Sequence, residues 1–139
     1  MASPRPRPTS PERERLLVVR RALLRLHKTL IDSERRVFES QNGALTNSQF
    51  LQKLLEDPFF NWLRPYSGLI VQMDEAMAAD EPLDAEALRD FLAEAHAVAA
   101  PEEGSDAAER LHAAQARDPM VRAAQAEAMK RIAEASAEG

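Results

Sequence analysis

The spacing of apolar residues between positions 57 and 77 is typical of one face of an amphipathic helix. Asp57 and Pro58 favour a helix start, because aspartate caps free amide groups and proline suits the first helical position. Pro65 interrupts this segment without changing the phase of the pattern, so we expect one helix with a kink near residues 61–65. The apolar positions recur at three- and four-residue steps: Phe59, Trp62, Leu63, Tyr66, Leu69, Ile70, Met73 and Met77.

Aromatic side chains are concentrated at the start of this segment, which also holds the only tryptophan of the chain. A large aromatic side chain on the apolar face of a helix contributes strongly to a hydrophobic core. The sequence therefore predicts an aromatic core made of Phe59, Phe60, Trp62 and Tyr66.

A long helix is predicted before this segment, from residue 9 to about residue 41. Thr9 and Glu12 have the spacing of a capping box, and Asn42-Gly43 supplies a left-handed stop. Two apolar stripes run side by side along the helix, and together they are wide enough to contact two neighbouring helices. The first stripe is Leu16, Val19, Leu23, Leu26, Leu30 and Val37, and the second is Leu17, Leu24, Ile31 and Phe38.

Two shorter helices complete the predicted core, over residues 46–56 and 84–100. Thr46 and Gln49 form a capping box for the first, and Asp84 caps the second. We expect the first of them to bury one edge, made of Phe50, Leu51, Leu54 and Leu55. Such a short helix is unstable alone, so packing against the rest of the chain must hold it.

The predicted fold is therefore all-α, a helical bundle of about four core helices formed by residues 9–100. Residues 1–8 are rich in proline and arginine, and we expect them to be disordered. Residues 101–139 are rich in alanine, which favours helix but buries little apolar area. We expect this segment to form helices over residues 107–116 and 119–136, as a peripheral or mobile tail.

Two polar residues, His27 and Glu34, lie on the second apolar stripe of the long helix. A buried polar group without a partner costs about 1–3 kcal/mol, so each of them needs one. Arg64, next to the proposed kink, is the candidate cation for Glu34. His27, Glu34 and Arg64 would then form a polar latch that fixes helix register. The alternative is that the same three residues line a ligand pocket.

Charge is distributed unevenly, because residues 1–36 are basic while the rest of the chain is acidic and the total is −5. One interpretation is that the first helix docks electrostatically on its own acidic body. The other is a basic face for nucleic acid, although acidic residues interrupt it and no helix-turn-helix is recognisable. The residues of this candidate basic face are Arg13, Arg20, Arg21, Lys28, Arg35 and Arg36.

The sequence offers little material for catalysis. Without cysteine it has no disulfide, thiolate nucleophile or thiolate metal ligand. Glu109 and His112 form the one Glu-x-x-His pair, whereas a di-iron bundle requires two, so we expect neither a metal site nor another cofactor. No phosphate-binding or dinucleotide-binding glycine motif is present. No apolar run is long enough to cross a bilayer, and no apolar signal segment follows the N-terminus, so we expect a cytoplasmic protein.

Two motifs, LHKTLIDSER at residues 26–35 and DPFFNWLRPYS at residues 57–67, carry a resemblance. With them, residues 12–82 resemble a family of small all-helical bacterial proteins whose function is uncharacterised. The shared pattern is a Leu-His pair with Glu-Arg seven residues later, followed by Asp-Pro, an aromatic residue and Trp-Leu-Arg-Pro. This resemblance implies an all-α fold and a bacterial cytoplasmic origin, and it implies no activity.

Three hypotheses for function follow from these features. The first is a non-enzymatic helical interaction module that binds a protein partner or a second copy of itself, through exposed parts of the first helix or the alanine-rich tail. The second is a nucleic-acid-associated protein that uses the basic N-terminal helix, which the acidic total disfavours. The third is a small-molecule-binding bundle with a pocket near Arg64. No membrane partner is expected.

Overall fold

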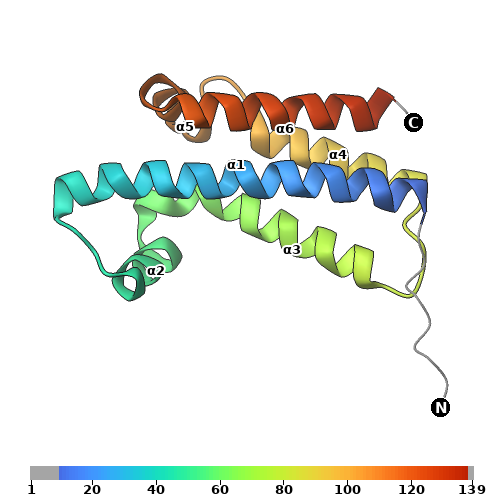
Figure 1. The fold of residues 1–139 in the computed structure, drawn as a ribbon, viewed down its shortest axis with the longest axis horizontal. Coiled ribbons are helices and arrows are strands. Elements are labelled where there is room, and N and C mark those ends of the chain that lie inside the picture. The colour runs from blue at the N-terminus through green and yellow to red at the C-terminus, as the bar shows by residue number, and fades with distance from the viewer. Residues whose placement is uncertain (1–9, 138–139) are drawn as a thin grey trace, which may run out of the picture.

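A computed structural model describes residues 10–137, which form six α-helices and one short 3-10 helix (Figure 1). The predicted all-α bundle is confirmed, since no strand occurs in the described part of the chain. The elements in chain order are α1 (Pro11–Asn42), α2 (Asn47–Glu56), η1 (Pro58–Leu63), α3 (Arg64–Ala78), α4 (Ala85–Ala99), α5 (Asp106–Arg117) and α6 (Pro119–Ala137).

Helix α1 is the centre of the bundle. In Figure 1 it lies between α3 and α6, with α4 behind, and α3, α4 and α6 each pack directly against it. Helix α4 in turn contacts both α3 and α6, which closes the bundle on one side of α1. The predicted first stripe of α1 faces inward at Leu16, Val19, Leu23, Leu26 and Leu30, all of which are buried.

Local capping signals place most helix ends. Thr46 and Gln49 form the predicted capping box at the start of α2, and the Asp84 side chain accepts a hydrogen bond from the Ala87 amide. Gly43 ends α1 with a φ of +93°, a conformation that glycine adopts without strain. At the start of α1 the cap is Ser10, whose hydroxyl accepts from the Arg13 amide, while the predicted cap Thr9 lies outside the described residues.

The predicted kinked helix is in fact two elements, η1 followed by α3. Pro65 has no amide hydrogen to give to Asn61, and its ring excludes the preceding turn from regular α-helix. The chain therefore winds as a 3-10 helix through Leu63, and Pro65 lies in the first turn of α3, where no amide is needed. The predicted apolar face is nevertheless correct. Phe60, Trp62 and Tyr66 are buried, and Phe59 is half-buried against the core.

Helix α6 is a full member of the bundle rather than a peripheral tail, and this corrects the prediction for residues 101–139. It packs along α1 and α4 through a stripe that is at most 5% exposed. The alanines are the reason, because small side chains let helix axes approach closely and so complete the core without large residues. The stripe consists of Val121, Ala124, Ala128, Ile132 and Ala135.

Candidate functional site

Glu34 is the most deeply buried charge in the described chain, at 2% exposure. Three donors surround its carboxylate. The Trp62 indole nitrogen donates across 3.1 Å, the Arg117 guanidinium forms an ion pair with Oε1, and Arg110 lies 3.7 Å from Oε2. Arg117 also donates to the Ser33 hydroxyl. This Glu34 cluster, defined as Glu34, Trp62, Arg110 and Arg117, fastens α5 and η1 to α1.

Arg64 is not the partner of Glu34, so the predicted latch of His27, Glu34 and Arg64 is wrong in its central pair. The Arg64 guanidinium is exposed and donates to the Leu55 carbonyl across 2.7 Å and to the Asn61 side chain. The reason is the 3-10 geometry of η1, which turns Trp62 toward Glu34 and leaves Arg64 beside the end of α2. The cations come instead from α5, in the segment that the sequence reading treated as peripheral.

His27 lies away from Glu34, against α3. Its ring stacks on Tyr66, with centroids 5.4 Å apart and ring planes 4° from parallel, and its Nε2 is 3.5 Å from the Ser67 hydroxyl. Partial burial lowers the pKa of His27, because desolvation penalises the charged imidazolium. The Tyr66 hydroxyl is buried with no hydrogen-bond partner in the described structure, and this burial raises the pKa of the phenol.

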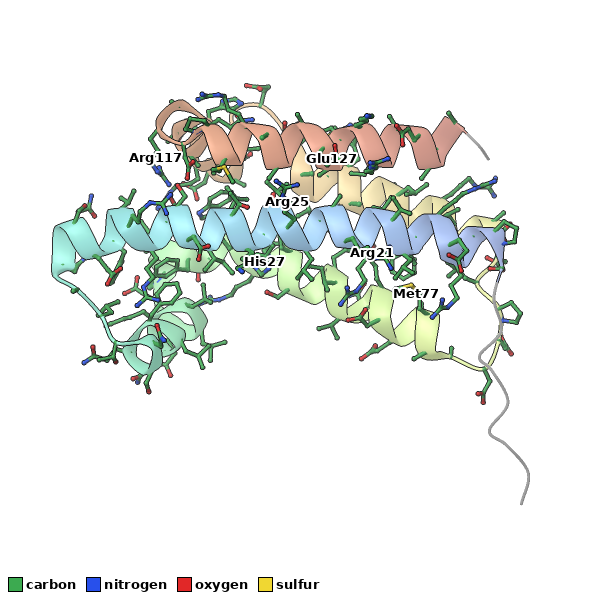
Figure 2. All side chains as sticks on the ribbon, viewed as in Figure 1. Arg21, Arg25, His27, Met77, Arg117 and Glu127 are labelled. Carbon is green, nitrogen blue, oxygen red and sulfur yellow. The ribbon has the colours of Figure 1, made fainter. Side chains whose placement is uncertain are left out.

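The candidate basic face is largely engaged within the molecule. Arg20 pairs with Asp74 of α3, and Arg36 reaches Asp118 across 2.5 Å. Arg13 donates to the Met77 carbonyl, and Arg35 pairs with Glu39 while its guanidinium lies over the Phe50 ring. Figure 2 labels Arg21 and Arg25 on α1, and both line a surface hollow that also contains Glu127 of α6.

Arg21 and Lys28 complete the candidate basic face, and neither makes a hydrogen bond or ion pair in the described part of the chain. The residues Arg13, Arg20, Arg35 and Arg36 thus connect α1 to other parts of its own body. This pattern favours internal electrostatic docking over a surface for phosphates.

Helix α2 exposes two leucine side chains, and Leu55 has the highest exposed fraction among the large apolar residues of the described chain. Leu51 is 56% exposed and Leu55 66% exposed, so the prediction that both belong to a buried edge is wrong. The helix packs mainly on η1 through Phe50, and it lies below α1 at one side of the bundle (Figure 1). Within residues 10–137 no other helix covers these leucines, and periodicity alone could not reveal their exposure.

A small pocket of about 220 Å³ adjoins these leucines. It lies between α2, η1, α3 and α1. Leu55 belongs both to the exposed pair of leucines and to the lining of this pocket. We call Leu51 together with this pocket the α2 surface. The pocket is lined by His27, Leu54, Leu55, Phe60, Leu63, Arg64 and Ser67.

The α2 surface combines apolar side chains with a few polar groups. Its lining is mostly apolar, with one guanidinium, one imidazole and one hydroxyl. No three His, Asp or Glu side chains between residues 10 and 137 come together as a metal site, and His112 contacts Glu103 instead. No helix in the same range is long and apolar enough to cross a membrane.

Sequence reasoning missed Arg110, Arg117 and the exposure of α2. Nothing local distinguishes Arg117 from the other basic residues, because its partner lies 83 positions away. A usable signal did exist for α6, since Val121, Ala124, Ala128, Ile132 and Ala135 recur at helical steps. Comparisons with protein-family models, curated proteins and solved structures find no significant match for this chain.

Proposed function

We propose that this protein is a non-enzymatic helical interaction module that binds a second copy of itself through the α2 surface. The observation that carries this proposal is the exposure of Leu51 and Leu55, at 56% and 66%, on a helix that lies at the edge of the bundle. Exposed leucines one helical turn apart are the usual anchors when a helix docks against another helix.

A second copy suits this surface on electrostatic grounds. The chain carries a net charge of −5, so most of its surface repels an identical molecule. The exposed edge of α2 is an exception, because Ser48, Leu51, Gln52 and Leu55 carry no charge. Lys53 and Glu56 flank this edge with opposite signs. A twofold axis through α2 would bring unlike charges together around an apolar centre, as an isologous interface requires.

The other functions have less support. The pocket of about 220 Å³ is smaller than the ~300–1,000 Å³ of typical small-molecule sites, so it favours a docked side chain over a separate ligand. Four residues of the candidate basic face already bond within the molecule, which weakens the case for nucleic acid. The proposal also includes a cytoplasmic location and membership of the uncharacterised bacterial family that the sequence resembles. The lack of cysteine agrees with a reducing cytoplasm.

Analytical ultracentrifugation over a wide range of protein concentration tests the self-association. We expect a reversible dimer for the unmodified chain and a monomer for the double variant Leu51→Gln with Leu55→Gln. Met120→Gln is the matched control, because Met120 is 59% exposed but belongs to α6, away from α2.

Circular dichroism must show that both variants retain their helices. A monomer at every concentration would refute self-association. A dimer that survives the α2 substitutions but is lost in Met120→Gln would place the interface on α6 instead.

A further inference from the structure

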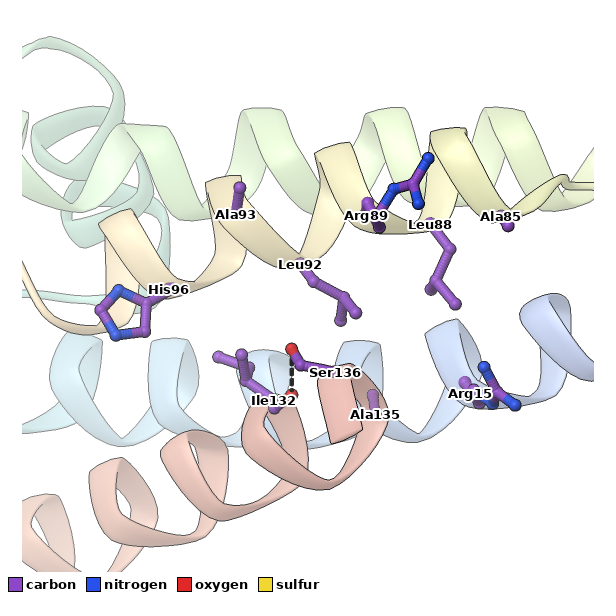
Figure 3. A pocket seen from close by; sticks show the side chains of 10 residues that line it. All are labelled: Arg15, Ala85, Leu88, Arg89, Leu92, Ala93, His96, Ile132, Ala135 and Ser136. Carbon is purple, nitrogen blue, oxygen red and sulfur yellow. Dashed lines mark hydrogen bonds between the residues drawn. The ribbon is translucent and has the colours of Figure 1, made fainter. Parts of the chain in front are cut away.

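A second and larger hollow lies on the other side of the molecule, between α4 and α6. It has a volume of about 470 Å³ and extends to the first turns of α1. Figure 3 shows Leu88 and Leu92 pointing from α4 toward α6, where Ile132 and Ala135 complete an apolar floor. We call this hollow the α4–α6 groove. All four floor residues are at most 5% exposed, so the floor is part of the packed core.

The size and shape of the α4–α6 groove are those of a ligand site. Its volume lies within the ~300–1,000 Å³ of typical small-molecule pockets, unlike the pocket at α2. The lining runs along α4 from Ala85 to His96, a length of roughly 16 Å at 1.5 Å per helical residue. The groove is therefore elongated, and an extended aliphatic chain suits it better than a compact ring system.

The charged side chains that line the groove are arginines. Its lining includes Arg15, Arg89 and His96 and contains no aspartate or glutamate, although the whole chain carries 23 acidic residues. Arg15 lies at the Leu88 end of the groove and His96 at the opposite end (Figure 3). Arg89 makes no hydrogen bond or ion pair in the described part of the chain, so its guanidinium is available to an anion.

We propose that the α4–α6 groove binds a medium-chain aliphatic monocarboxylate. The hydrocarbon chain lies against Leu88, Leu92 and Ile132, and the carboxylate pairs with Arg89. An apolar floor supplies affinity in proportion to the chain buried, whereas the guanidinium selects an anionic head. This site is separate from the α2 surface, and it holds whether or not the protein forms a dimer.

Titration calorimetry with octanoate, decanoate and dodecanoate, each below its micelle concentration, tests the apolar part. One methylene buried in the groove should tighten binding about fourfold, so each step of two carbons should give about fifteenfold. Decanol has the same chain without the charge. We expect it to bind about two- to fivefold more weakly than decanoate, the range that a partly exposed ion pair contributes.

Substitutions then locate the site. Arg89→Gln should weaken decanoate by the same two- to fivefold and leave decanol unchanged. Ala93→Trp enlarges an exposed residue that lines the groove and should abolish binding of both. Lys28→Gln removes the same charge from the outer face of α1 and serves as the control, with no effect expected. The Leu51→Gln, Leu55→Gln variant should also bind normally, which separates this site from the α2 surface.

Several results would overturn the proposal. They are the absence of saturable binding by any of the three acids, equal affinity of decanol and decanoate with no effect of Arg89→Gln, and undiminished binding in a folded Ala93→Trp variant. Flotation of the protein with phosphatidylglycerol vesicles, without binding of free decanoate, would also refute it and indicate a lipid surface as the source of the acyl chain.

Discussion

Replacing Arg117 by alanine should destabilise the fold, because Glu34 would lose its direct ionic partner while staying buried. Removing one member of a fully buried ion pair costs about 3–5 kcal/mol. Here the Arg117 side chain is 31% exposed, and Trp62 and Arg110 still donate to or approach the carboxylate. Water and these two donors reduce the loss, so we expect a decrease of about 2 kcal/mol in the free energy of unfolding.

Urea unfolding measured by circular dichroism and by Trp62 fluorescence provides the assay. The single tryptophan bonds directly to Glu34, so its emission reports the cluster, while the dichroism reports all helices. Coincident transitions would show that loss of Arg117 weakens the whole domain. A fluorescence change that precedes the loss of helix would show that α5 separates first.

A double-mutant cycle isolates the pair from side effects. Glu34→Gln combined with Arg117→Gln should give a coupling energy of about 1–2 kcal/mol, as contacting charged groups do. The matched control is Glu34→Gln with Arg64→Gln, the pair that sequence alone suggested, for which the coupling should be within about 0.5 kcal/mol of zero. Coupling of Glu34 to Arg64 but not to Arg117 would refute the arrangement of α5 described above.

Three further predictions concern Trp62, Tyr66 and His27. Trp62→Ala should lower the free energy of unfolding by about 3–5 kcal/mol, as loss of a buried aromatic does, and a midpoint in urea close to that of the parent would show that Trp62 is not core. Tyr66→Phe should be neutral or stabilising by up to about 1 kcal/mol, because the buried hydroxyl has no partner in the described structure. A large loss in thermal unfolding would reveal a hidden bond. Since burial lowers the pKa of His27 below its ordinary 6.5, the unfolded chain binds more protons below that pH. Stability should therefore fall as pH drops through 6.5, a loss that His27→Gln should remove in urea titrations above and below this pH.

The aromatic segment illustrates how far sequence reasoning reached at the candidate sites. Periodicity correctly placed Trp62 and Tyr66 on the inner face, and it identified His27 and Glu34 as polar residues in need of partners. It could not name those partners, because an ion pair between residues 34 and 117 depends on which helices become neighbours. The α4–α6 groove could not be predicted from the sequence either, because its walls come from three separate helices.

The sequence by itself determined most helices, the helix ends at Gly43, Thr46 and Asp84, and the apolar face from Phe60 to Tyr66, because these depend on interactions within a few residues. The tertiary structure decided which other helices, if any, those faces contact. It made α6 part of the core, left Leu51 and Leu55 on α2 uncovered, and brought Arg117 to Glu34. Burial and ion pairing are properties of the assembled bundle, in which small alanine side chains allow a close approach that the periodic pattern does not specify.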